Sequence, residues 1–133
     1  MKEINLRAHH ILCTQGFQGY GYNEQFTNNL MNFINSAKVE SKIKINLSCK
    51  CDDICEKCPN NKKGVCIHED VIHMDELILK ELNLKRIIES NFEDLIKIAN
   101  SKLKNHKKCN EICGRCSWKN VCLWFKEADK IYI

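Results

Sequence analysis

The sequence predicts a mainly α-helical domain, α+β with at most one or two short strands, that carries two cysteine-rich loops. Two observations predict this fold class: apolar residues recur at helical spacing in several segments, whereas only residues 43–47 alternate between apolar and polar. The chain has 133 residues, of which 44% are hydrophobic and 29% charged, a composition typical of globular proteins. We therefore expect a single domain covering residues 1–133.

The N-terminal part contains two expected helices. Residues 6–13 are apolar enough for a short helix, which the glycines of QGFQGYGY, residues 15–22, would end. These glycines favour tight turns around aromatic residues or a close approach of the backbone to a cluster sulfur. Asn23 can cap a second helix. The apolar residues at helical spacing in this second segment are Phe26, Leu30, Phe33 or Ile34, and Ala37.

The central and C-terminal parts contain one expected strand and further helices. Three apolar residues of 43–47 alternate with two polar ones, which predicts a short strand leading to the first cysteines. Residues 75–84 have a helical pattern. Ser90-Asn-Phe-Glu93 is a capping-box pattern that would open another helix. The residues expected on the core face of that helix are Phe92, Leu95, Ile96, Ala99 and Leu103.

Eight of the ten cysteines form two similar groups. The groups are CDDICEKCPNNKKGVC at residues 51–66 and CNEICGRCSWKNVC at residues 109–122, and both begin Cys-x3-Cys-x2-Cys. Four thiolates at this spacing repel one another unless a cation or a cationic cluster core holds them together. We therefore expect two inorganic sites, in loops 49–66 and 109–122. The expected ligands are Cys51, Cys55, Cys58, Cys66, Cys109, Cys113, Cys116 and Cys122.

The compartment and the charge bear on the role of these cysteines. The N-terminus has no signal-peptide pattern, and no apolar run is long enough to cross a bilayer, so we expect a cytoplasmic protein with reduced thiols and no membrane contact. The formal net charge is +4. Two four-thiolate sites of about −2 each would reduce the total to about zero. The basic balance is therefore poor support for nucleic-acid binding, which we do not expect.

The spacing of the cysteines favours iron–sulfur clusters over zinc. Structural zinc sites usually pair two Cys-x2–4-Cys units across a longer spacer, whereas crowded cysteine runs are typical of iron–sulfur ligation. The Cys58-Pro59 pair is also a feature of ferredoxins, although Ser117 follows Cys116 in the second group. The sequence thus predicts two [4Fe-4S] clusters, with two Zn²⁺ ions as the alternative because thiolates accept either.

Two cysteines lie outside the two groups. Cys49 precedes Cys51 by two residues and is a possible substitute ligand. In RAHHILC, His9 lies four residues before Cys13 and His10 lies three before it, so a helix would place both imidazoles on the side of the thiol.

Three interpretations of this histidine–cysteine segment are open. The first is a buried thiol with two hydrogen-bonded histidines. In the second, Cys13 or a histidine is a ligand that replaces Cys51 or Cys109. In the third, a neighbouring histidine or Arg7 lowers the pKa of Cys13 and makes it a reactive thiol, so that Cys13, His9 and His10 are the candidate catalytic residues.

RAHHILC, GFQGYGY and DDICEKCP together resemble a bacterial and archaeal domain-of-unknown-function family of about this length. The resemblance covers residues 6–124 and implies iron–sulfur binding, with no activity assigned. It leaves Cys13 a candidate for the fourth ligand of a site. The positions that match the family pattern are His9, His10, Cys13, Gly19, Tyr22, Asp53, Cys55, Cys58, Cys66, Cys113, Cys116, Trp118 and Cys122.

Three functions follow as hypotheses. Two clusters in one small domain predict ferredoxin-like electron transfer, for which we expect a redox partner protein. An alternative is a redox or sulfur-handling enzyme in which Cys13 reacts with His9 or His10 beside a cluster. A second alternative is a zinc-stapled binding module. The sequence predicts no oligomeric state.

Overall fold

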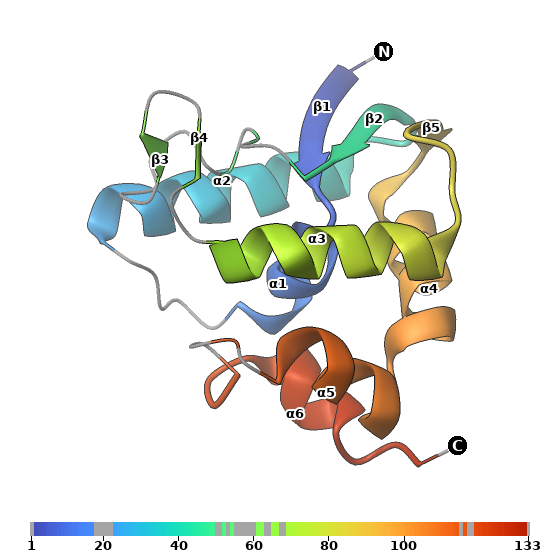
Figure 1. Cartoon of the computed structure of the whole chain (residues 1–133). Coiled ribbons are helices and arrows are strands. Elements are labelled where there is room, and N and C mark those ends of the chain that lie inside the picture. Colours follow the sequence, from blue (N-terminus) through green and yellow to red (C-terminus); the bar gives the residue numbers. More distant parts are fainter. Residues whose placement is uncertain are drawn as a thin grey trace.

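The computed structural model contains a helical layer that covers one face of a small sheet (Figure 1). It describes residues 2–17, 23–49, 52, 54, 61–62, 65–66, 69–114, 116 and 119–132. The elements are β1 (Lys2–Arg7), α1 (His10–Gly16), α2 (Glu24–Val39), β2 (Ile43–Ser48), β3 (Asn61–Lys62), β4 (Val65–Cys66), α3 (Glu69–Leu82), β5 (Ile87–Ser90), α4 (Phe92–Leu103), α5 (His106–Cys113) and α6 (Leu123–Ala128). The mainly helical α+β class predicted from the sequence is confirmed.

The sheet is mixed, with the strand order β1-β2-β5. β2 pairs in parallel with β1, so that Ile45 lies opposite Ile4, and antiparallel with β5, so that Ile45 also lies opposite Ile88. Parallel strands need a crossover connection, which α1 and α2 supply between β1 and β2. The expected strand at 43–47 is confirmed, and its apolar side chains are buried on the face that meets the helices.

The strands are more numerous than the one or two we expected. The expected helix at 6–13 is wrong at its start, because Leu6 ends β1 together with Arg7 and the helix begins only at His10. Ile4 and Leu6 are buried while Glu3 and Asn5 are exposed, which is the two-residue period of a half-buried strand. The structure therefore contains β1 and β5 in the sheet and the short β3–β4 hairpin in addition to the expected strand β2.

Helix ends follow local capping chemistry. The Asn23 side chain accepts a hydrogen bond from the Phe26 amide, which confirms the predicted cap of α2. The predicted capping box at Ser90 is wrong by one residue: Ser90 ends β5, and Asn91 caps α4 by accepting from the Asp94 amide.

The helix predicted at 75–84 is also longer than expected at its start. It is α3, which begins at Glu69 and ends at Leu82. Asn83 follows it with a φ of 50°, in the left-handed region that asparagine tolerates at helix ends.

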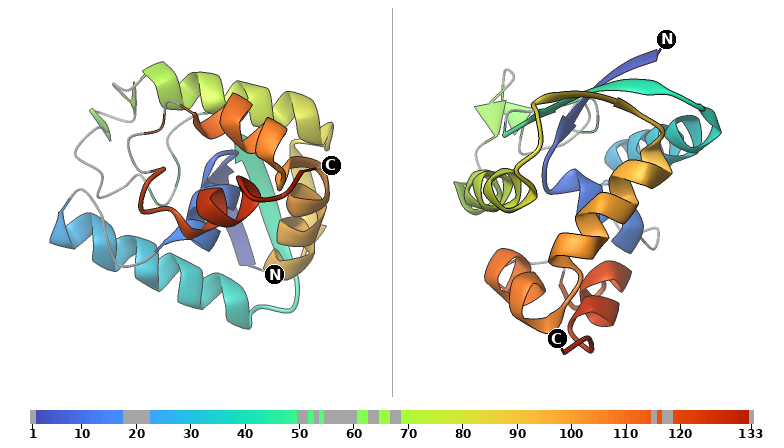
Figure 2. Two further views of the ribbon diagram at one scale, coloured as in Figure 1. Left: turned by 90° about the horizontal axis from the view of Figure 1, so that it is seen from below. Right: turned by 90° about the vertical axis from the view of Figure 1, so that its right-hand side faces the viewer.

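The core lies between the sheet and the helices. Figure 2 shows α1 in the middle of the helical layer, between α2 and α3, with α5 and α6 farthest from the sheet. Fully buried side chains of β2, α3, α4 and α6 meet around α1, among them Ile45, Ile78, Leu95 and Trp124. Within the described part of the chain, no helix has the length and hydrophobicity needed to cross a membrane.

Candidate metal centre

Four cysteines from opposite ends of the chain lie close together. Cys13 is on α1, Cys113 is the last residue of α5, and Cys122 immediately precedes α6. Cys116 lies in the loop between α5 and α6, where its amide donates a hydrogen bond to the Cys113 carbonyl. A charge on the Cys13 thiol would interact with charges on each of the other three. We call these four residues the cysteine site.

Gly16 allows α1 to approach the cysteine site. α1 packs against α6, and Gly16 lies one helical turn after Cys13. A Cβ atom at Gly16 would lie 2.2 Å from the Sγ atom of Cys122, far inside van der Waals contact. Only glycine fits this position unless the sulfur atom moves. The close approach of the backbone to a sulfur atom is found at Gly16, where the sulfur is the Sγ atom of Cys122; that this sulfur belongs to a cluster stays a prediction.

We expect Gly16→Ala to reduce the free energy of unfolding by about 1–3 kcal/mol, because the added methyl group overpacks the contact between α1 and Cys122. Denaturant titration of the metal-free chain measures this change. The matched background is Cys122→Ala, which removes the sulfur atom that the methyl group would meet. In that background the cost should fall clearly, and an equal cost in both backgrounds would contradict the proposed contact.

Cys109 lies apart from the cavity beside the cysteine site. Its buried thiol donates to the carbonyl oxygen of His106 at 3.5 Å, one helical turn back on α5. Burial and the charge of Asp129 raise its pKa to about 11. The second cysteine segment is therefore not an irregular loop throughout, as we expected, because residues 109–113 are helical. This helix places Cys109 one turn before Cys113, and a charge on Cys113 would interact with charges on Cys116 and Cys122 and, more weakly, on Cys109.

A cavity opens beside the cysteine site. Its volume is about 110 Å³, enough for more than one water molecule. Cys13, Cys116 and Cys122 line it together with His9 and His10, and the rest of its wall is mainly apolar. The expectation that both histidines share a side with Cys13 agrees with this arrangement.

All four donors of the cysteine site are thiols, the donor set of iron–sulfur clusters and also of many structural zinc sites. Burial and the neighbouring thiols raise the pKa values of Cys13 and Cys113, so both thiols stay protonated unless a cationic core replaces the protons. Zinc draws its thiolates to about 2.3 Å from one centre. Among the described residues, no three His, Cys, Asp or Glu side chains are grouped closely enough to hold one metal ion. A cluster keeps its thiolates farther apart, because irons and sulfides lie between them.

The first cysteine group stays a prediction. Cys51, Cys55 and Cys58 lie outside the described residues, and of Cys66 only the backbone in β4 is described. Cys49, the possible substitute ligand, is a half-buried free thiol that directly follows β2. The other family-pattern positions outside the described residues are Gly19, Tyr22, Asp53 and Trp118.

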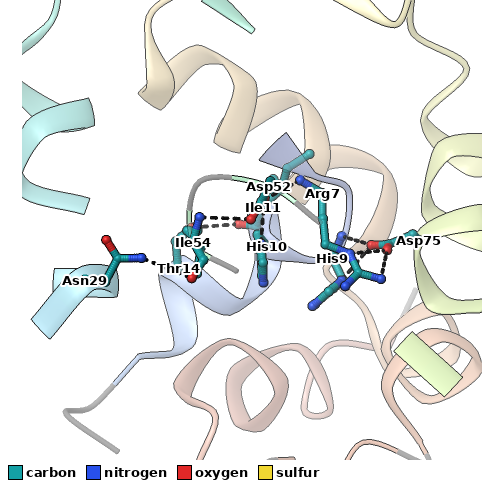
Figure 3. A network of polar contacts seen from close by, with 9 residues as sticks. All are labelled: Arg7, His9, His10, Ile11, Thr14, Asn29, Asp52, Ile54 and Asp75. Carbon is teal, nitrogen blue, oxygen red and sulfur yellow. Dashed lines mark hydrogen bonds and ion pairs between the residues drawn. The ribbon is translucent and has the colours of Figure 1, made fainter. Parts of the chain in front are cut away.

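Two buried histidine–aspartate pairs lie next to the cysteine site (Figure 3). The Nδ1 atom of His9 is 2.6 Å from Oδ1 of Asp75, and Nδ1 of His10 is 2.7 Å from Oδ2 of Asp52. Arg7 Nε donates to Oδ2 of Asp75 at 2.8 Å. Burial alone would raise the pKa of Asp75, but the hydrogen bonds and charges of His9 and Arg7 lower it, so this carboxylate stays ionised.

The two aspartates fix the start of α1 to other parts of the chain. Asp75 of α3 accepts the backbone N–H of His9 at 2.8 Å, and Asp52 accepts the backbone N–H of Arg7 at 2.6 Å. Asp52 also accepts the N–H of Ile54 at 3.0 Å. The sequence analysis missed both aspartates. The signal for Asp75 was a carboxylate on the apolar face of a helix, beside the buried residues Met74 and Ile78.

The pKa of Cys13 does not favour a reactive thiol. Burial, the neighbouring thiols and Asp75 raise this pKa well above its ordinary value, whereas a nucleophilic cysteine needs a lowered one. Within the described structure, neither His9 nor His10 donates a hydrogen bond to the thiol. The arrangement therefore suits a ligand or a buried thiol better than an activated nucleophile.

Stability should fall as the pH is lowered. Burial and the neighbouring His10 lower the pKa of His9 in the folded chain from its ordinary value of 6.5. As the pH falls below 6.5, His9 is therefore protonated in the unfolded chain before it is in the folded chain, which favours unfolding. Because the pKa of Asp75 is also lowered in the folded chain, its protonation below pH 3.8 reduces stability further. Denaturant titrations of the metal-free chain measure the decline, and His9→Gln should lack the part that begins near pH 6.5. Stability that rises toward acid in this range, relative to His9→Gln, would contradict the direction.

The described fold and site define a class: a mainly helical α+β domain with a group of free cysteines, of which Cys113 is buried and the other three are half-buried. The chain belongs to the family described as "Protein of unknown function (DUF1284)", whose sequence model matches residues 21–122. This match confirms the resemblance seen in the sequence. No curated protein and no solved structure is significantly similar to the chain.

Proposed function

We propose that the protein binds an iron–sulfur cluster through Cys13, Cys113, Cys116 and Cys122 and uses it in electron transfer. The observation that carries this proposal is the convergence of four thiols, one buried and three half-buried, from the two ends of the chain. An all-thiol donor set is the usual ligand set of two-iron and four-iron clusters. Compared with the sequence-based set, Cys13 takes the place of Cys109.

The residues around the cysteine site support a redox role. A bound cluster would supply one-electron chemistry, and the protein sets its potential through hydrogen bonds, charge and exclusion of water. Gly16 brings α1 close to Cys122, and Phe17 and Phe26 contribute apolar wall to the adjacent cavity. Trp124 is 1% exposed and its indole N–H donates to Asn100, which fixes an apolar ring two residues after Cys122.

The proposal extends to the first cysteine group. Cys51, Cys55, Cys58 and Cys66 repeat the spacing of the second group and would hold a second cluster. Two clusters would let the protein accept and pass on electrons, so we propose a redox partner protein. If Cys13 belongs to the second site, Cys49 remains as a possible substitute for one of the four ligands of the first.

Metal analysis of protein purified without air tests the proposal. We expect brown protein with equal amounts of iron and acid-labile sulfide, about four irons per chain for one [4Fe-4S] cluster and about eight for two. Dithionite should bleach the visible absorption and produce a paramagnetic resonance signal. Colourless protein with zinc and no sulfide would overturn the proposal in favour of a zinc-stapled module.

A further inference from the structure

His9 and His10 carry a feature that the cysteine site does not use. Asp75 accepts the main-chain N–H of His9 and the Nε–H of Arg7, and Asp52 accepts the main-chain N–H groups of Arg7 and Ile54. A carboxylate that already accepts from two donors acts as an acceptor, so we assign the proton of each imidazole to Nδ1, the nitrogen that faces the carboxylate. In the neutral ring this leaves the Nε2 atom with a free lone pair.

Both Nε2 atoms lack a hydrogen-bond partner among the residues that the structure describes. His9 and His10 are each 7% exposed, and both line the cavity beside the cysteine site. In Figure 3 each ring extends away from its carboxylate, with the second nitrogen at the far end. The ring centroids are 4.2 Å apart and the ring planes are tilted by 52°. Two adjacent lone pairs thus face a shared, partly enclosed space.

The charges around the two rings favour a cation over an anion. Counting only the described residues in contact with the two rings, and with both imidazoles neutral, Asp52, Asp75 and Arg7 sum to a charge of about −1, and thiolates in the cysteine site would make it more negative. Imidazole nitrogen is a good ligand for divalent iron, cobalt, nickel and zinc. Metal-binding histidines usually donate their other N–H to a carboxylate, as both rings do here.

We propose that His9 and His10 bind one divalent transition-metal ion through their Nε2 atoms, in the cavity beside the cysteine site. Two nitrogens that share an ion at about 2.0–2.1 Å each are at most about 4 Å apart, and the two rings are direct neighbours, with centroids 4.2 Å apart. Among the described side chains only these two would be ligands, because no group of three is present. The remaining positions stay open to water or to a small ligand in the cavity.

The test is titration with Co²⁺ of anaerobically purified, cluster-containing protein. We expect one equivalent to bind, with the weak d–d absorption of nitrogen and oxygen ligation and without intense thiolate charge-transfer bands. His9→Gln combined with His10→Gln should weaken this binding at least tenfold, and Asp52→Asn should weaken it about 10–100-fold through loss of the carboxylate behind His10. The matched control combines His73→Gln with His106→Gln, changes on α3 and α5 away from the cavity, and should bind like the wild type.

Several results would overturn the proposal. Equal Co²⁺ binding by the wild type and the His9/His10 double variant would show adventitious binding only, and absence of binding by the folded wild type would leave no metal site. Loss of iron from the double variant would instead make the histidines cluster ligands. X-ray absorption of the Co²⁺-loaded wild type, which needs no variant, should show two imidazole ligands.

The experiments distinguish failure of the histidine metal site from failure of the proposed cluster. If the purified protein contains no iron, the cluster proposal fails, but the histidine-dependent d–d bands remain distinguishable from charge-transfer bands of Co²⁺ on free thiols. If iron is present and the histidine variants have no effect on Co²⁺, only the second metal site fails.

Discussion

The Asp75→Asn variant should lose about 3–5 kcal/mol of its free energy of unfolding, the usual cost of removing one partner of a buried ion pair. Arg7 is 2% exposed, and its Nε and Nη2 atoms each lie 2.8 Å from Oδ2 of Asp75. The same carboxylate accepts the main-chain N–H and the Nδ1 hydrogen of His9. An asparagine has no negative charge to balance the positive charge of Arg7. Its side-chain NH₂ group would also face Arg7 and His9 groups that are themselves hydrogen-bond donors.

Denaturant titration near neutral pH measures this loss. The matched control is Glu76→Gln, the same change of charge one residue later on α3, at an exposed position. The control should change stability by less than about 0.5 kcal/mol, as surface substitutions usually do. A loss in Asp75→Asn no larger than that of the control would show that the contacts between Arg7, His9 and Asp75 contribute little to the fold.

The second large effect is expected for Cys13→Ser, which should remove the iron of the cysteine site while the chain stays folded. Cys13 is half-buried and its raised pKa keeps the thiol protonated without metal, so the neutral hydroxyl of serine is a close substitute in the metal-free fold. It is a poor substitute as a soft ligand. If both cysteine groups hold clusters, iron and sulfide should fall to about half of the wild-type amount.

Cys109→Ser is the matched control for Cys13→Ser. Both thiols lie on helices, but only Cys13 lines the cavity with Cys116 and Cys122, whereas Cys109 donates to the carbonyl oxygen of His106. We expect Cys109→Ser to retain its iron and its visible spectrum. The opposite result, with iron lost from Cys109→Ser and kept in Cys13→Ser, would restore the four consecutive cysteines as the ligand set and reject α1 as part of the site.

Local signals in the sequence were sufficient for part of the fold. The alternation of Ile43, Ile45 and Leu47 predicted β2, and Asn23 predicted the cap of α2, because both depend on residues that are neighbours in the chain. β1 and β5 were missed. β1 leads directly into the apolar start of α1, and the pattern of β5 is short, so both become clear only from their pairing with β2.

The sequence by itself determined that this protein has ten cysteines, eight of them in two repeated groups, and that it belongs to a family with the same motifs. Only the tertiary structure decided that Cys13 faces the second group and that His9 and His10 each meet a carboxylate. The physical reason is the range of the interactions. Spacing fixes which thiols of one segment can converge, but packing of α1 on α6, with Gly16 against Cys122, fixes which distant side chain joins them.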